Sequence, residues 1–268
     1  MFRFTLCFGL AIFLGTVGQS FASDNDQPWV SAQEILEAAT HDINASGGIR
    51  GVEKDVPDME KALSTAIPSG TLVEANNGQT IALADGMAEV LIVGVTASKA
   101  GKKVNIIATP YPLIGLYLGS YYNEIGKPED ALRVLNAAIS VSDAENLGLA
   151  EHIPFLTSEK GAALESLKRF DDALAVYKAG LKLAANSDGD EARMFRGVGF
   201  SLTELGRLDD AEAAYRKSLL CEPGNAHAEN ELKYIAKLRA GNSATPGALE
   251  TALPQADAPA DKSACPKE

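Results

Sequence analysis

The chain is poor in the residues that carry most enzyme chemistry. It has three histidines, three cysteines and one tryptophan among 268 residues. The histidines His41, His152 and His227 fall in three different segments, and no serine elbow, metal-binding box or dinucleotide fingerprint accompanies them. Adjacent residues on a helix face different ways, so we interpret His41, beside Asp42, as a solvated histidine rather than as half of an acid–base pair. We therefore expect no enzyme activity, no catalytic residue, no metal ligand and no cofactor.

Positive charge is also scarce. The chain has 24 lysines and arginines against 36 aspartates and glutamates, which gives a formal net charge of −12. Proteins that bind nucleic acid neutralise phosphates with a basic surface. The balance therefore argues against a nucleic-acid partner, and we interpret the acidity as a contribution to solubility.

Long apolar runs are confined to the N-terminus. Arg3 is the only charged residue between Met1 and Ala22, and an apolar run extends from Phe4 to Val17. The run is shorter than the roughly 20 residues that a transmembrane helix needs, and small residues follow it, as in a secretory signal. We predict a signal peptide over 1–22 and a periplasmic or secreted mature chain with no transmembrane segment. An uncleaved anchor is the alternative.

The second half of the chain repeats. Three glycines are each followed twelve residues later by an alanine, and the intervals between the glycines are 42 and 38 residues. The pairs are Gly119 with Ala131, Gly161 with Ala173, and Gly199 with Ala211. Around each pair two apolar runs at helical spacing flank a short break, and acidic pairs open the second run, which suits a helix N-terminus.

These units resemble the tetratricopeptide repeat (TPR), a helix–turn–helix of about 34 residues. The family pattern places small residues, aromatics and a closing proline at fixed offsets. Residues that match it include Leu118, Gly119, Tyr122 and Ala131 in the first unit, Gly161, Phe170, Ala173 and Tyr177 in the second, and Gly199, Gly206, Ala211, Tyr215 and Pro223 in the third. The spacings exceed the family length, so we expect longer loops near 142–151 and 186–191. The resemblance implies a superhelix of three hairpins over 112–240, with 225–240 as a capping helix. An unrelated helical bundle is the alternative.

Inside each hairpin we expect the glycine and the alanine of a pair to face each other, as with Gly119 and Ala131. Without bulk at either place the two helices can approach closely, and overpacking there costs about 1–3 kcal/mol.

The part before the repeats, 24–110, predicts a small α+β unit. Ser31-Ala32-Gln33-Glu34 matches a capping box before an apolar helical face, and 57–67 is a second short helix candidate. The segments 71–75, 80–83, 90–97 and 102–109 are rich in Val, Ile, Leu and Thr, and Asn77-Gly78 favours a hairpin turn. We predict three or four antiparallel strands that lean on the first repeat, with room for the contact provided by Gly115. The overall class is thus α+β, and the tail 241–268 is expected to be disordered.

Two cysteines remain after signal cleavage, Cys221 at the end of the third repeat and Cys265 in the tail. An oxidising compartment would allow a bridge between them. We prefer the interpretation of Cys221 as an ordinary buried residue and keep the disulfide as the alternative.

The resemblance also implies where a partner would bind, because the first helix of each TPR unit lines the concave face. The exposed positions of these helices give a candidate partner-binding set of Arg193, Arg196, Phe200, Asn230, Tyr234 and Lys237. Arginine forks bind carboxylates in two places, and aromatics supply anchoring area. A partner with an exposed carboxylate is therefore expected, although a solvated face is the simpler alternative. Leu116 and Ser120 do not match the carboxylate clamp of some family members, so that ligand is not carried over.

The leading hypothesis is an exported TPR scaffold that binds a protein or peptide in a cell-envelope assembly. The alternatives are a self-associating structural protein and, third, a small enzyme domain at 24–110 with an appended TPR.

Overall fold

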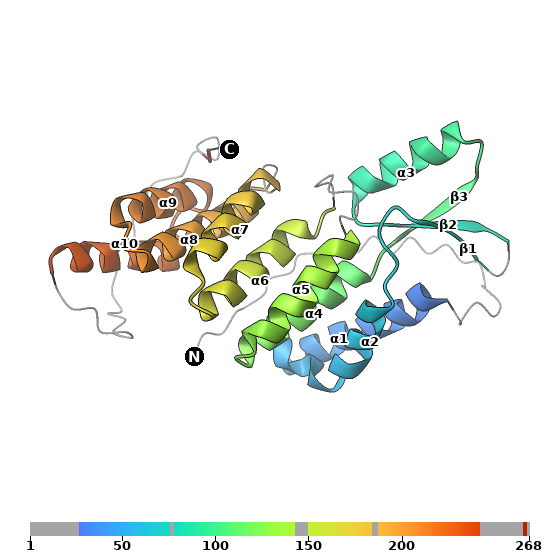
Figure 1. Cartoon of the computed structure of the whole chain (residues 1–268), viewed down its shortest axis with the longest axis horizontal. Helices are drawn as coiled ribbons and strands as arrows, with labels where there is room; N and C mark the ends of the chain where they lie inside the picture. The colour runs from blue at the N-terminus through green and yellow to red at the C-terminus, as the bar shows by residue number, and fades with distance from the viewer. Residues whose placement is uncertain (1–26, 76–77, 143–149, 184–186, 242–264, 267–268) are drawn as a thin grey trace.

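The computed structural model describes residues 27–75, 78–142, 150–183, 187–241 and 265–266. Seven consecutive helices, α4 to α10, form a row, and a small sheet with helix α3 lies at the end of the molecule remote from α10 (Figure 1). The N-terminal helices α1 and α2 lie against the first hairpin of the row.

Three hairpins and a capping helix make up the row, as the repeats predict. The hairpins are α4 (Tyr111–Glu124) with α5 (Pro128–Ser142), α6 (Ile153–Ser166) with α7 (Phe170–Leu183), and α8 (Asp188–Glu204) with α9 (Leu208–Cys221). Helix α10 (Ala226–Arg239) follows and packs on α9 and α8. The prediction of TPR-type hairpins is confirmed. Of the two long loops expected, 143–149 and 184–186 lie outside the described residues, and α8 already begins at Asp188, with Ser187 as its N-cap.

Each hairpin turns through one residue with a positive φ, seven positions after its repeat glycine. Gly126 and Gly206 both have φ 73°, and Lys168 occupies the same place in the second hairpin with φ 58°. A left-handed backbone is easy for glycine and unfavourable for a side chain with a Cβ atom. The geometry of the turn therefore overrides the local preference of Lys168.

The row has two unequal layers. Helix α4 contacts α6, and α6 contacts α8, whereas among the described residues α5 makes no contact with α7 and α7 makes none with α9. Closer approach of the first helices than of the second helices bends the row toward the first helices. We call the surface formed by α4, α6 and α8 the helix-A face; it is the concave side of the array, and α10 extends the row beyond α8.

Each repeat glycine packs against a large side chain of the facing helix and not against the alanine of its pair. A Cβ atom added to Gly119 would lie 2.5 Å from Cγ of Leu135, and one added to Gly199 would lie 2.8 Å from the ring of Tyr215. The partner is thus the residue sixteen positions later, and the expected pairing of Gly119 with Ala131 is wrong. Ala131 is fully buried and keeps the helices close by its own small size.

The N-terminal helices begin differently from the prediction. Helix α1 spans Pro28–Ser46, a short 3₁₀-helix spans Ile49–Lys54, and α2 spans Val56–Ser64. Because α1 already begins at Pro28, Ser31 lies inside it and does not act as a cap, so the capping-box prediction is wrong. Proline at the first helical position has the φ that a helix needs and lacks only an N–H that would have no partner.

The sheet is mixed rather than antiparallel. Strand β1 (Leu72–Glu74) pairs antiparallel with β2 (Thr80–Ala84), and β2 pairs parallel with β3 (Val104–Ala108). The predicted strand at 90–97 is instead part of helix α3 (Met87–Lys99), which connects the two parallel strands. A continuous apolar run of this length fits a buried strand and a segment of a helix, so the sequence pattern alone could not decide between them. The parallel pairing follows, because a crossover needs an intervening element.

The sheet packs against the first hairpin as expected. Leu83 belongs to the same buried cluster as Tyr111 and Leu135, and the backbone N–H of Ser69 donates to the carbonyl of Val141. Gly115 has another role than the one predicted, because a Cβ atom there would meet Ala138 of α5 and not the sheet.

No helix in the described part of the chain is long and apolar enough to cross a membrane. The predicted signal peptide at 1–22 and most of the predicted disordered tail lie outside the described residues.

Candidate partner-binding face

Three polar residues, one from each hairpin, lie on the helices that form the helix-A face. The side-chain amide of Asn123 on α4 donates two hydrogen bonds to Glu159 on α6, to the carbonyl oxygen and to Oε2, both at 3.0 Å. Burial raises the pKa of Glu159, although the hydrogen bond from Asn123 and the charge of Arg193 on α8 oppose the shift. The first two hairpins are thus joined by hydrogen bonds on the concave side, and the charge of Arg193 on the third hairpin acts on Glu159.

Arg193 is the exposed cation of this face. Its guanidinium carbon lies 5.4 Å from the centre of the Phe155 ring, which is within the range of a cation–π interaction. Among the described residues no carboxylate oxygen lies within 4.0 Å of the guanidinium. The charges of Glu159 and Arg193 interact over a longer distance. The stack on Phe155 therefore orients Arg193 and leaves its hydrogen-bond donors open to a carboxylate from outside.

Arg196 already has a partner within the chain. Its Nη1 atom lies 2.5 Å from Oε2 of Glu222, and only 18% of the Arg196 side chain is exposed. Phe200 is likewise engaged, since its ring meets that of Phe170 edge-on with centroids 6.5 Å apart. Both residues lie on the predicted helix, but Arg196 links α8 to the end of α9 within the third hairpin, and Phe200 links the third hairpin to the second.

The three remaining candidates lie on the capping helix α10, which packs on α9 and α8. Asn230 and Tyr234 are half-buried on α10 and Lys237 is exposed. In the part of the chain that the structure describes, no hydrogen bond or ion pair joins them to Arg193 or Arg196. The predicted set is thus divided between α8 and α10, and whether its members act together stays a prediction.

The sequence analysis missed two residues of the second hairpin that contact the third hairpin on this face. Phe155 lies six positions before Gly161, just as Arg193 lies six before Gly199, so the repeat offset could have identified it. Glu165 accepts a hydrogen bond from Oγ of Ser201 at 3.2 Å. Burial raises the pKa of Glu165 to about 8, against the hydrogen bonds from Ser201 and Tyr177.

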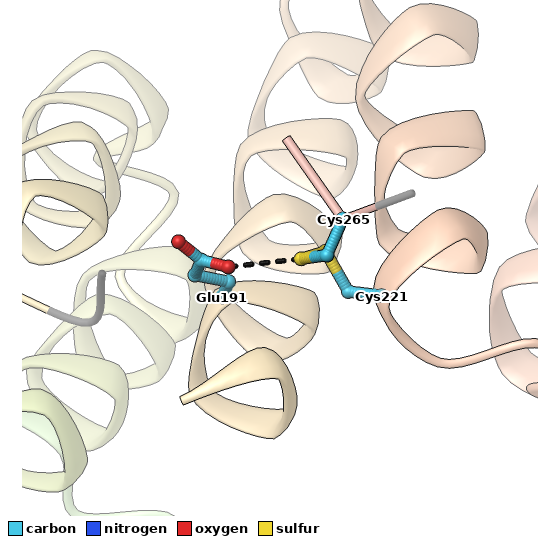
Figure 2. A group of neighbouring side chains, drawn as sticks. All are labelled: Glu191, Cys221 and Cys265. Atoms are coloured by element: carbon cyan, nitrogen blue, oxygen red, sulfur yellow. Dashed lines mark hydrogen bonds between the residues drawn. A yellow bond between two sulfur atoms is a disulfide. The ribbon is translucent and has the colours of Figure 1, made fainter. Parts of the chain in front are cut away.

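Cys221 and Cys265 form a disulfide, so the preferred interpretation of Cys221 as a free buried residue is wrong. Sequence alone could not settle this, because the pairing depends on where the tail returns. Figure 2 shows Oε2 of Glu191 pointing at the Sγ atom of Cys265, 2.8 Å away. These are the three metal-ligand side chains that come together among the described residues, but the sulfur atoms are bonded to each other and not available as thiolates.

A histidine–carboxylate pair joins the sheet to the second hairpin. Nδ1 of His152 is hydrogen-bonded to Oδ1 of Asp85, which follows β2 and is almost fully buried. Burial opposes protonation of His152, but the hydrogen bond to Asp85 and its charge outweigh burial and raise the pKa of His152. Oγ of Ser69 donates to Glu89 and not to His152, so the residues do not form a nucleophile–base arrangement.

Comparison with known proteins found similarity only to solved structures. No family model matches the chain, and no curated protein does. The first TPR domain of human RPAP3 is 23% identical, with 49% of this chain and 94% of that chain covered and a TM-score of 0.42. The first TPR of Spaghetti (RPAP3), solved with the HSP90 peptide SRMEEVD, is 24% identical over 48% and 94%, with a TM-score of 0.41. BtubC of P. vanneervenii is 14% identical over 89% and 100%, with a TM-score of 0.41. The description of the hairpins therefore depends on the contacts within this chain and not on these similarities.

Proposed function

We propose that this chain is an exported scaffold whose helix-A face binds an acidic segment of a protein partner in a cell-envelope assembly. The observation that supports the proposal most is the state of Arg193. It is an exposed guanidinium, oriented by Phe155, on the concave side of an array, and no carboxylate of the described residues pairs with it. The export and the envelope setting rest on the N-terminal sequence alone.

The geometry narrows the earlier candidate set. Arg196 would have to leave Glu222 before it could bind a partner, which costs the energy of an existing ion pair. Arg193 needs no such exchange. The aromatic face of Phe155 beside it offers an apolar residue of the partner a surface next to the carboxylate site.

Affinity capture from envelope extract, followed by binding measurements with the recovered partner, tests the proposal. Arg193→Ala should weaken binding by about 2–5 kcal/mol if the contact is desolvated, since a broken charge pair leaves the partner carboxylate without a counterion. Arg193→Lys should retain part of the affinity, because lysine keeps the charge but lacks the planar fork.

Arg216→Ala is the matched control. Arg216 lies on α9 in the second layer, is 68% exposed, and pairs with Glu212 of its own helix. Its removal should leave the affinity unchanged. A partner that binds the Arg193→Ala and Arg216→Ala variants with equal affinity, at both low and high salt, would show that the helix-A face is not the binding site.

A further inference from the structure

Helix α3 carries an apolar surface that nothing in the described structure covers. Met87, Leu91, Ile92 and Val95 are 71%, 62%, 44% and 54% exposed. Among the described elements α3 contacts only β2 and β3, toward which it buries Val93 and Ala97, and it lies at the outer end of the molecule (Figure 1). The exposed stripe is therefore a ridge on the surface and not part of the core.

The stripe has a consistent direction. Met87, Leu91 and Val95 recur every four residues and so lie on one face of the helix, turned away from the buried face of Val93 and Ala97. We call Met87, Leu91, Ile92 and Val95 the α3 stripe.

Positive charge borders the α3 stripe although the chain as a whole is acidic. Lys99 in the last turn of α3 falls on the exposed side beside Ile92, and Lys102 and Lys103 follow directly. All three lysines are exposed, and none forms an ion pair with a described residue. The one acidic residue of α3, Glu89, is occupied elsewhere, since it accepts hydrogen bonds from Ser69 and from the backbone of Asp85. Two other carboxylates border the opposite end of the helix, that of buried Asp85 just before Gly86 and that of Glu151 beside Gly86.

The form of the ridge favours a lipid surface over a protein partner. A stable protein interface buries about 800 Å² on each side with a packed core, and four partly exposed side chains on one helix of 13 residues offer far less. An interfacial helix needs only a row of apolar side chains that enters the acyl boundary and cations that reach the headgroups. A basic border beside an apolar stripe is complementary to an anionic lipid surface.

We propose that α3 is a membrane-interface helix that lies in the plane of an anionic lipid surface. The α3 stripe enters the headgroup–acyl boundary, and Lys99, Lys102 and Lys103 bind lipid phosphates. The helix-A face is at another part of the molecule, so this binding is independent of the peptide-binding function proposed above.

Co-sedimentation of the chain, as purified from cells, with vesicles tests the proposal. One set of vesicles contains phosphatidylcholine alone, and the other contains phosphatidylcholine with about one third phosphatidylglycerol. The two sets differ in their anionic lipid, which is the variable to be tested. We expect binding to the anionic vesicles, with at least a tenfold loss when salt is raised and little binding to the neutral vesicles. Replacing Lys99, Lys102 and Lys103 with glutamine should lower the partition coefficient roughly a hundredfold, at about fivefold for each lysine.

The α3 stripe is tested by Met87→Gln, Leu91→Gln and Val95→Gln together, which should abolish sedimentation with vesicles. The matched control is Leu183→Gln with Leu220→Gln, because these leucines are 36% and 46% exposed on α7 and α9. Glutamine at Lys127, Lys178 and Lys233, which are exposed in other helices and turns, controls for net charge. Both controls should bind as the unmodified chain does.

Two results would overturn the proposal. One is equal vesicle binding by the unmodified chain and by both test variants, which places any lipid contact elsewhere. The other is a concentration-dependent dimer in light scattering that the stripe variant loses, without vesicle binding, which makes a second copy the occupant. The lysine variant changes only exposed side chains, so it keeps the test decisive even if the stripe variant fails to fold.

Discussion

Gly161→Ala tests the packing inside the array most directly. The Tyr177 ring fills the space left by two missing side chains, that of Gly161 in its own hairpin and that of Gly197 in the next. A Cβ atom at position 161 would lie 2.5 Å from Cε1 and 2.7 Å from Cε2 of Tyr177. Carbon atoms prefer separations of about 3.5–4.0 Å, so the ring or a helix must move by about 1 Å.

The magnitude follows from two opposing effects. Tyr177 is only 4% exposed and its ring lies against both glycines, so the ring has little room to move, and overpacking of this kind costs about 1–3 kcal/mol. Alanine gains about 1 kcal/mol over glycine in a helix interior. We expect a net loss of up to about 2 kcal/mol in the free energy of unfolding. For a chain of this size the midpoint of thermal unfolding should fall by up to about 8 °C.

Circular dichroism during thermal and urea unfolding measures the effect, with Gly189→Ala as the control. Gly189 lies in the first turn of α8, and nothing lies within 4 Å of a Cβ atom placed there. That variant should be unchanged or more stable by up to about 1 kcal/mol. The assay thus compares the same chemical change at a filled and at an empty site.

The result that would refute the packing argument is a rise in the midpoint for Gly161→Ala similar to that for Gly189→Ala. Combining Gly161→Ala with Tyr177→Leu adds a second check. If the two residues compete for one space, the double variant should lose less stability than the sum of the single variants, with a coupling of about 0.5–3 kcal/mol.

Two further predictions concern covalent and proton linkage. The Cys221–Cys265 disulfide closes a loop with a sequence separation of 44, so reduction or Cys221→Ser should cost up to about 4 kcal/mol; an unchanged midpoint under reducing conditions, with both thiols then alkylated, would contradict this. The raised pKa of Glu165 means that the folded state holds its proton more tightly than the unfolded state, so this contribution to stability is present below about pH 4.5 and is lost as pH rises toward 8. Glu165→Gln should therefore add about 1–3 kcal/mol at pH 9 and almost nothing at pH 4, and equal effects at both pH values in urea unfolding would contradict the assignment.

The repeat pattern predicted the array well because its determinants are local. The apolar spacing, the glycine at two of the three turns and the acidic first turns act within one hairpin, and the three hairpins and the capping helix were placed from them. The partner of each repeat glycine was predicted wrongly, because sequence spacing shows which positions repeat but not which side chain fills the gap. Tyr177 and Leu135 occupy these gaps, and both lie on the facing helix.

The N-terminal unit shows the limit of local pattern more clearly. The run at 90–97 has the composition and the length of a strand but lies within the 13-residue helix α3, and its conformation is decided by where β2 and β3 must connect. The His152–Asp85 pair and the disulfide depend on long-range approach: their partners are 67 and 44 positions apart. Contacts of this kind follow from the tertiary fold and leave no periodic trace in the sequence.

The third hairpin is the best-anchored place for a binding residue in this array. The start of α8 is capped by Ser187, whose hydroxyl accepts a hydrogen bond from the backbone of Asp190, and buried Glu191 lies against the disulfide that ties the tail to α9. Arg193 comes two residues later and rests on Phe155 of the preceding hairpin. A guanidinium held at its base and along its length loses less conformational entropy when it binds a carboxylate than one on a free surface helix does. This is the physical reason why we assign the partner contact to Arg193 rather than to Lys237 on the terminal helix, which lacks such support.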